Sequence, residues 1–219
     1  MKKYLPILKS TQLFSGVVEE DIAAMLSCLQ ARECTYKKGE YVLRQGERTS
    51  NIMIPVEGKL HIQRDDFWGN RSIVSMVDTG EMFGEAYAAS DSVPVMNDVL
   101  AVEDSTVIFL DVKRIITACP TACSFHSAVI QNLVFAISEK NRALVRKLGY
   151  MSERTTREKL IAYLSEEAKR HNCSTFCIPF DRQQLADYLS VDRSAMSNEL
   201  CKMRDDGLLD FHKNRFSLH

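Results

Sequence analysis

The sequence predicts an α+β fold in which a region of short antiparallel strands is followed by one long helix and then by a small helical domain. Three observations carry this prediction. β-rich runs alternate with glycine-containing turns between residues 33 and 110, a seven-residue apolar repeat occupies 124–151, and two capped helices follow residue 181. Strands at regular spacing indicate antiparallel β structure, whereas apolar residues three and four apart indicate helix.

The composition is that of an ordinary folded protein, with 219 residues of which 45% are hydrophobic. No apolar stretch reaches the roughly 18 residues of a membrane span, and the first residues lack the long apolar run of a secretory signal. The seven cysteines are odd in number and widely spaced, which does not indicate a disulfide framework. We therefore expect a cytoplasmic protein with reduced thiols and no membrane partner.

The first 111 residues are expected to form one domain. Residues 16–30 carry an apolar stripe at helical spacing, and the β-rich texture begins at about residue 33. Strands are expected at Tyr41–Leu43, Ile52–Val56, Leu60–Ile62, Ser72–Val77 and Thr106–Leu110. Many short strands joined by turns predict an antiparallel β-roll of the double-stranded β-helix, or jelly-roll, type.

Residues 112–151 are expected to contain a long central helix that joins two copies of the chain. Its apolar positions fit a heptad repeat, in which residues spaced seven apart from Ile130 are d positions and those spaced seven apart from Val134 are a positions. Asn141 is an a position, where a buried pair of asparagine amides can fix the register of the two helices. The predicted interface residues are Ile130, Val134, Ile137, Asn141, Leu144, Leu148 and Met151. A long helix packed on its own domain is the alternative reading.

Residues 152–219 are expected to form a winged helix-turn-helix domain. Thr155 and Glu158 have the spacing of a capping box at the start of a helix over 156–170, and residues 174–180 look strand-like. Asp181 and Asp192 are suitable N-caps for two further helices joined by a turn at Ser190-Val191. Gly207 ends the last helix, and a hairpin around Lys213-Asn214 forms the wing.

The second of these two helices has a polar outer face. With Met196, Leu200 and Met203 pointing inward, Arg193, Ser194, Ser197 and Asn198 remain on the outer side of its first turns. Arginine can pair twice with guanine and asparagine twice with adenine in the major groove. The alternative is that these residues are merely solvated. The net charge gives no support to DNA binding, because residues 152–219 hold 11 basic and 11 acidic side chains.

The chain resembles the Crp/Fnr family of bacterial regulators over nearly its whole length. The resemblance rests on Tyr36–Glu40, Gln45–Glu47, Val56–Gly58 and Gly80–Glu85 in the roll, and on Arg182–Leu189 and Arg193–Asn198 in the helix-turn-helix. It implies a homodimer that binds double-stranded promoter DNA, without enzymatic activity or cofactor. The resemblance also implies RNA polymerase as a further partner. Activation is the commoner mode of transcription regulation in that family.

The family's DNA contacts carry over onto this sequence residue by residue. Arg182 and Gln183 become phosphate contacts, and Arg193, Ser194, Ser197 and Asn198 become base readers, with Lys202 beside them. Ser194 and Asn198 depart from the glutamate and arginine that are common in the family, so the DNA half-site should differ. Ser190 replaces a common turn glycine, and we expect the turn not to require one.

The effector site also departs from the family pattern. Cyclic-nucleotide binders have a Gly-Glu pair followed about ten residues later by an arginine that pairs with the phosphate. Gly84-Glu85 is present, but residues 86–112 contain neither arginine nor lysine. The sequence therefore predicts a small-molecule effector other than cyclic AMP, bound by Gly84, Glu85, Tyr87, Val95, Met96 and Asn97 and closed over by Asn141, Leu144 and Val145. A collapsed pocket that binds nothing is the alternative.

Three other functions fit the sequence less well than a DNA-binding regulator with a small-molecule effector. Cys119, Cys123 and His126 have ligand-like spacing, but they supply only three of the four ligands of a zinc site, so a redox- or metal-responsive regulator remains a weaker alternative and no metal is expected. An enzyme on a cupin-like barrel needs several metal-binding histidines, and residues 33–110 contain only His61. A regulatory module that binds a cyclic nucleotide but no DNA would not need a helix-turn-helix.

Overall fold

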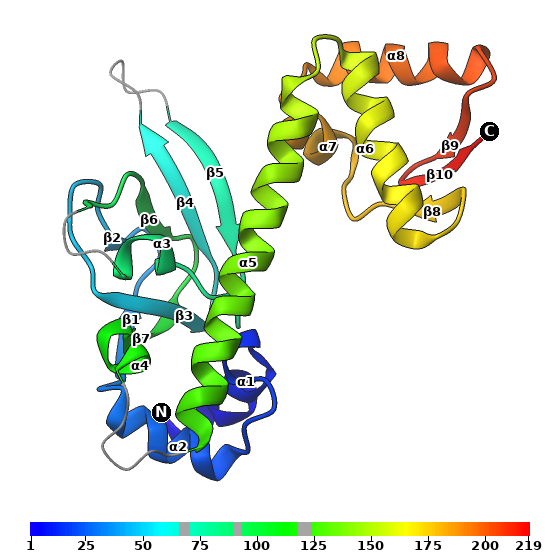
Figure 1. Cartoon of the computed structure of the whole chain (residues 1–219). Coiled ribbons are helices and arrows are strands. Elements are labelled where there is room, and N and C mark those ends of the chain that lie inside the picture. The colour runs from blue at the N-terminus through cyan, green and yellow to red at the C-terminus, as the bar shows by residue number, and fades with distance from the viewer. Residues whose placement is uncertain (66–70, 90–92, 118–123) are drawn as a thin grey trace. The chain divides into compact units, whose positions relative to one another are not determined.

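The computed structural model describes residues 1–65, 71–89, 93–117 and 124–219. It divides into two compact units, Met1–Ser138 and Glu139–His219, and each is considered by itself. The division falls inside the long helix α5 (Ser124–Ser152), which begins in the first unit and ends in the second (Figure 1). The domain limits predicted at residues 111 and 151 come from changes in the sequence pattern, and they stay predictions.

The first unit contains a β-roll made of two antiparallel sheets. One sheet has the strand order β1-β7-β3, and the other has the order β2-β6-β4-β5. The strands are β1 (Arg32–Tyr36), β2 (Tyr41–Leu43), β3 (Asn51–Glu57), β4 (Leu60–Asp65), β5 (Arg71–Val77), β6 (Asp98–Ala101) and β7 (Ser105–Asp111). The predicted fold class is confirmed. Strands β1 and β6 were not predicted, because the first is largely polar and the second is short.

The alternation of side chains along β3 and β7 gives the β1-β7-β3 sheet two buried faces. Met53, Val107 and Phe109 face the other sheet and fill the roll together with residues such as Leu60 and Val99. Their neighbours in sequence form the opposite face, which packs on helices: Ile52, Ile54, Ile108 and Leu110. Because both faces are covered, β3 and β7 read as continuous apolar runs rather than alternating ones.

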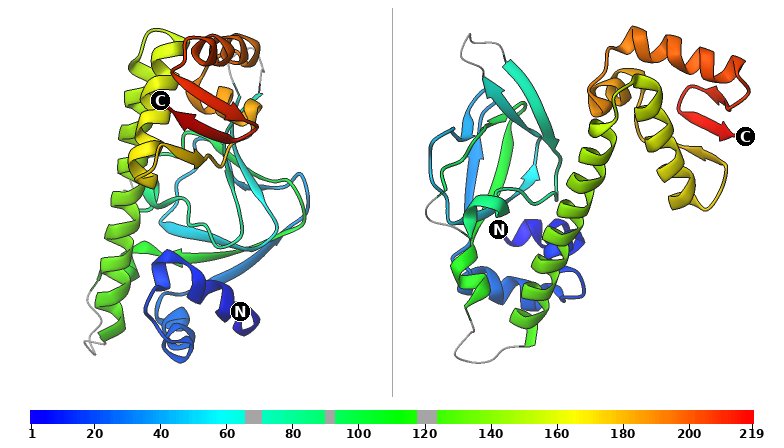
Figure 2. Two further views of the ribbon diagram at one scale, coloured as in Figure 1. Left: turned by 90° about the vertical axis from the view of Figure 1, so that its right-hand side faces the viewer. Right: turned by 45° about the horizontal axis from the view of Figure 1, so that its top comes forward.

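The helices of the first unit cover the second face of that sheet. They are α1 (Leu5–Ser10), α2 (Glu19–Cys28), α3 (Glu85–Ala88), α4 (Val112–Ile116) and the first half of α5, with 3₁₀ turns at Lys2–Tyr4 and Gln12–Phe14. Two views in Figure 2 place α1 and α2 beside the start of α5. Val129 and Leu133 of α5 belong to the same core as α1 and α2, and the Asn132 amide donates to the carbonyls of Leu13 and Ser15.

The second unit packs three helices, α6, α7 and α8, together with the end of α5 against a small antiparallel sheet. The elements are α6 (Thr156–His171), β8 (Thr175–Cys177), α7 (Arg182–Leu189), α8 (Arg193–Asp205), β9 (Leu209–His212) and β10 (Arg215–Leu218), and the sheet has the order β8-β10-β9. One apolar cluster includes residues of every one of these elements. Across the described ranges, no helix combines the length and apolar character that crossing a membrane requires.

Two turn glycines of the roll differ in the space around them, which gives a matched test of the fold. Both have left-handed backbone, with φ of +81° at Gly58 and +88° at Gly46. A Cβ at Gly58 would lie 2.2 Å from Ser105 Oγ and 2.6 Å from the Asp104 carbonyl oxygen, whereas one at Gly46 would meet nothing within 4 Å. Of these two turns, only the one at Gly58 packs tightly against its neighbours.

We predict that Gly46→Ala destabilises the protein by about 1 kcal/mol through backbone strain alone. Gly58→Ala should cost a further 1–3 kcal/mol, roughly, because it also overpacks the contact with β7. Urea unfolding followed by circular dichroism measures both. Equal midpoints for the two variants would show that the contact at Gly58 contributes nothing.

Candidate nucleic-acid interface and effector site

Both helices of the helix-turn-helix begin at the predicted aspartate caps. The Asp181 carboxylate accepts a hydrogen bond from Gln184 N at 2.8 Å, and the Gln184 side chain accepts one from Asp181 N. At the start of α8, Asp192 accepts from Ala195 N at 2.7 Å. These bonds satisfy amide groups that the helices cannot satisfy themselves, so both N-termini are held firmly.

Helix α8 has one buried and one exposed face, as predicted. Met196, Leu200 and Met203 are fully or almost fully buried in the core of the unit. Arg193, Ser194 and Asn198 are exposed, and Ser197 is half-buried, with its hydroxyl donating to the Arg193 carbonyl at 2.9 Å. Lys202 is exposed and lies 3.8 Å from Glu199. The first turns of α8 therefore present guanidinium and amide groups to solvent from a rigid base.

Sequence reasoning missed two residues of this exposed face. Cys201 and Asp205 are exposed on the same side of α8, one and two turns beyond Asn198. Cys201 is three and four residues from Asn198 and Ser197, and Asp205 is four residues from Cys201, so the helical spacing could have found both. The face is therefore longer than predicted, and it ends in a carboxylate.

The two predicted phosphate contacts sit at the start of α7 in different surroundings. Arg182 is half-buried, with its guanidinium 4.7 Å from the ring centre of Phe211 and 5.1 Å from that of Phe216, both in the wing. Burial lowers the pKa of Arg182 below its usual value. Gln183 is exposed and donates to Asp187. Arg182 thus holds the wing against α7, and its contact with phosphate stays a prediction.

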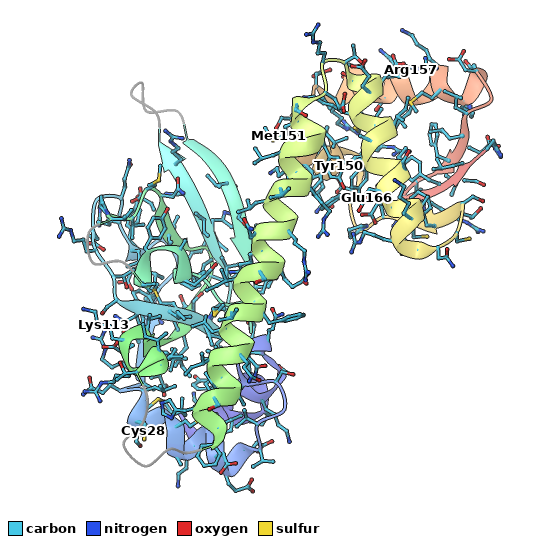
Figure 3. All side chains as sticks on the ribbon, viewed as in Figure 1. Cys28, Lys113, Tyr150, Met151, Arg157 and Glu166 are labelled. Carbon is cyan, nitrogen blue, oxygen red and sulfur yellow. The ribbon has the colours of Figure 1, made fainter. Side chains whose placement is uncertain are left out.

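Helix α6 supports α8 through an ion-pair network. Arg157 of α6 lies 3.2 Å from the Glu199 carboxylate and also pairs with Asp206 just beyond α8 (Figure 3). The hydrogen bond with Asp206 is the main cause that raises the pKa of Arg157. The helix itself begins with the predicted capping box of Thr155 and Glu158. The network is far from obvious in sequence, because its partners are more than 40 positions apart.

An aromatic cluster ties the end of α5 into the second unit. Tyr150 lies in the last turn of α5 (Figure 3). It is buried and packs edge-on against Tyr163 of α6, with ring centres 5.6 Å apart, while Tyr188 of α7 and Phe180 complete the cluster. Burial raises the pKa of Tyr150 to about 12 and raises those of Tyr163 and Tyr188. The helix-turn-helix is therefore fixed directly to the last turn of α5.

The turn and the wing follow the predicted positions. Strands β9 and β10 form a hairpin around Lys213-Asn214, and Gly207 has left-handed backbone where α8 ends. Ser190 is also left-handed, with φ of +53°. Serine is accommodated there, as expected, although glycine adopts this left-handed backbone more readily.

Three of the predicted effector residues of the roll lie at the start of α3. Gly84 has left-handed backbone, with φ of +84°, which favours glycine. Glu85 begins α3, and its Oε2 is shielded from solvent. Tyr87 packs against the core of the roll. These three residues are brought together by one tight turn.

The residues expected to replace the cyclic-nucleotide phosphate site have separate environments. Val95 is buried in the roll, and its backbone pairs with Gly46 and Glu47. Met96 is exposed, and Asn97 is half-buried. Asn141, Leu144 and Val145 are exposed on the part of α5 that belongs to the second unit. Their closing of the pocket stays a prediction.

The two faces of α5 differ in burial, and the dimer interface predicted on one of them stays a prediction. Val129, Leu133 and Ala136 are buried, and Ile130 is half-buried against the same core. The rest of the predicted interface stripe is exposed: Val134, Ile137, Asn141, Leu144, Leu148 and Met151. The helix thus packs on its own unit and still leaves an apolar stripe without a partner.

Of the three residues weakly predicted to bind a metal, only His126 lies in the described part of the chain. Cys119 and Cys123 lie outside the described residues. His126 is buried at the start of α5, with Nε2 3.3 Å from the Arg114 carbonyl oxygen, as a core histidine would be. In the ranges that the structure describes, no group of three or more His, Cys, Asp or Glu side chains could hold a metal ion.

Two family models match the chain, one for each unit. Residues 33–121 match the model described as a cyclic nucleotide-binding domain, and residues 158–219 match a Crp-like helix-turn-helix domain. The first match covers the β-roll and the second covers α6 to the wing. Together they include the predicted effector residues of the roll and all of the predicted DNA-binding residues.

Individual proteins show the same combination. The Cyclic AMP receptor protein of Thermus thermophilus is 23% identical over 205 residues, which cover 92% of this chain and 89% of that protein. Human cGMP-dependent protein kinase 2 is 27% identical over 50% of this chain, but the match spans only 14% of the kinase.

Among solved structures, the Thermus thermophilus catabolite activator protein has a TM-score of 0.54 at 20% identity, covering 95% of this chain and 94% of that one. OCPA-complexed CprK has a TM-score of 0.62 at 16% identity, covering 89% and 88%. At these identities the likeness establishes the fold.

Proposed function

Because the chain joins a cyclic nucleotide-binding domain to a Crp-like helix-turn-helix domain and so belongs to the Crp/Fnr family, we propose that it regulates transcription by binding promoter DNA in the cytoplasm. The observation that carries this proposal is the exposed first half of α8. Its base, Met196, Leu200 and Met203, is buried, and its N-terminus is capped by Asp192. A helix held in this way can enter the major groove with its first turns against base edges.

Arg193 and Asn198 are the proposed specificity residues. Their guanidinium and amide groups can each make two hydrogen bonds to one base, guanine and adenine respectively. Phosphate contacts come from the ends of α7 and the wing, where Arg182 and Lys213 border one cavity of about 470 Å³. Since the unit is nearly neutral overall, affinity must depend on this local concentration of cations rather than on bulk charge.

We predict that Arg193→Ala lowers affinity for the protein's own promoter fragment by roughly 1–3 kcal/mol while affinity for scrambled DNA changes little. Lys169→Ala is the matched control, because Lys169 is an exposed cation of α6 away from the reading face. Fluorescence anisotropy at fixed salt measures the affinity of wild type and of both variants for the promoter fragment and for scrambled DNA. Wild type that binds promoter and scrambled DNA equally well would refute the proposal.

We also propose that two copies associate through the exposed stripe of α5. Val134, Ile137, Leu144, Leu148 and Met151 are each at least 42% exposed, and large apolar side chains in a continuous row are typical of an interface. The seven-residue spacing fits a parallel two-stranded coiled coil. A dimer of this kind would present two copies of α8 to one palindromic site.

Leu148→Asp should convert the dimer to a monomer, because it would bury a carboxylate in an apolar seam. Ala143→Asp is the control, since Ala143 is exposed on the opposite face of the same helix. Sedimentation velocity reports the state of each variant. A wild-type monomer, or equal behaviour of the two variants, would contradict this arrangement.

The effector is proposed to be a small molecule other than cyclic AMP. Ten residues after Glu85 the chain has Val95, buried in the roll with 3% of its surface exposed, in place of the expected arginine. A cyclic phosphate placed beside Val95 would lose its water without gaining a cation, which costs free energy. The apolar surroundings of Tyr87 and Val95 favour an uncharged organic ligand instead.

Calorimetric titration of the full chain with cyclic AMP is therefore expected to give no saturable heat. A thermal-shift screen of small organic molecules is the companion measurement, and its positives should change affinity for promoter DNA. Saturable binding of cyclic AMP would overturn the argument from Val95.

A further inference from the structure

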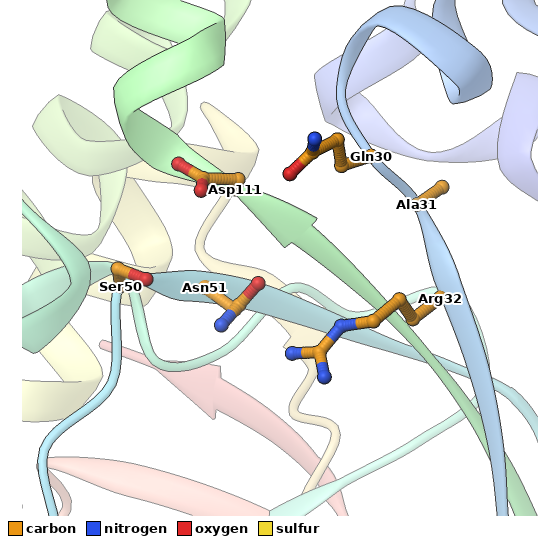
Figure 4. A pocket seen from close by; sticks show the side chains of 6 residues that line it. All are labelled: Gln30, Ala31, Arg32, Ser50, Asn51 and Asp111. Atoms are coloured by element: carbon orange, nitrogen blue, oxygen red, sulfur yellow. The ribbon is translucent and has the colours of Figure 1, made fainter.

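One pocket of the first unit is lined by none of the predicted effector residues, although its residue Asn51 lies beside Gly84. It has a volume of about 430 Å³ and is lined by Gln30, Ala31, Arg32, Ser50, Asn51 and Asp111 (Figure 4). Small-molecule sites commonly have volumes of roughly 300–1,000 Å³. The pocket is therefore large enough for a metabolite, and all but Ala31 of its lining residues have polar side chains.

The strand register explains why these residues meet. Arg32 of β1 is the cross-strand partner of Phe109 in β7, and Asn51 of β3 is the partner of Asp111 in β7. Phe109 and Asp111 are two residues apart, so all four lie on one face of the sheet. The same face carries Met53 and Phe109 into the roll, and the polar residues stand at its end.

The hydrogen-bonding groups of this pocket are largely unused. Within the described part of the chain, the Arg32 guanidinium has no ion pair or hydrogen bond, and its contact is with the Phe109 ring at 5.7 Å. The side-chain amides of Gln30 and Asn51 have no hydrogen-bond partner in that part either. Donors and acceptors that face a cavity without partners are available to a ligand.

The pocket also carries two opposite charges that do not pair with each other. Asp111 Oδ1 accepts from Lys113 N at 2.8 Å and from Arg114 N at 3.4 Å, and no ion pair joins it to Arg32. Figure 4 shows the guanidinium and the carboxylate on different sides of the opening, with the Asn51 amide between them. A simple anion would meet Asp111, and a simple cation would meet Arg32.

We infer that this pocket binds a free α-amino acid. Arg32 receives the α-carboxylate through paired N–H donors, as guanidinium groups do. Asp111 receives the α-ammonium group, and the amides of Gln30 and Asn51 serve a polar side chain. A zwitterion is the smallest common metabolite that satisfies both charges at once.

The experiment titrates the full-length protein with L-glutamine and with two analogues that each lack one charge. Glutaramate lacks the ammonium group, and 4-aminobutanamide lacks the carboxylate. Calorimetry should give saturable binding of L-glutamine and at least about tenfold weaker binding of both analogues, because each loses one of the two charged contacts. Glutaramate bound as tightly as L-glutamine would overturn the zwitterion assignment in favour of an anion site.

Three variants complete the test. Arg32→Gln and Asp111→Asn should each weaken L-glutamine binding by about tenfold or more, and asparagine keeps the capping role of Asp111 in α4. Arg44→Gln is the control, since Arg44 is an exposed arginine of the same unit that stacks on Tyr41 at 4.1 Å. Wild-type binding by both pocket variants, or no saturable binding of L-glutamine at millimolar concentration, would refute the site. The readout does not involve DNA, so this failure would leave the proposed function standing.

Discussion

One uninterrupted helix supplies core residues to both units of this protein, and the rest of the structure depends on it. Val129 and Leu133 of α5 lie in the core of the first unit, whereas Tyr150 lies in the core of the second. The 29 residues of the helix are held turn by turn by its own backbone hydrogen bonds. The roll and the helix-turn-helix thus each include part of α5 in their own core.

The helix-turn-helix shows how a nearly neutral domain can still be built to read DNA. Its rigidity comes from caps, from the Arg157 network and from four aromatic rings, none of which requires net positive charge. Arg182 has a structural role of this kind, because its guanidinium group stacks on the rings of Phe211 and Phe216. Such contacts are worth more when the guanidinium is partly desolvated, as it is here. In the proposed function, specificity depends on a few side chains on the first turns of α8.

Local signals accounted for much of the fold. Helix α5 and the wing hairpin were predicted almost to the residue, because heptad spacing, aspartate caps and a two-residue turn act within a few positions of the chain. The strands β1 and β6 were missed, since their pairing with β7, β2 and β4 is long-range and their own sequences are polar or short. Ser190 shows the same limit at one residue, because its left-handed backbone is imposed by the helices on either side.

The sequence by itself determined which residues face outward on α8, which lie on the stripe of α5 and where the cation of a cyclic-nucleotide site is missing, because periodicity and spacing are properties of the chain. Only the tertiary structure decided that Arg182 stacks on the wing, that Tyr150 joins the second core and that Arg32, Asn51 and Asp111 share one face of a sheet. These contacts join segments that strand pairing and helix packing bring together from distant positions. Their partners are chosen by burial and register, which no local pattern of residues encodes.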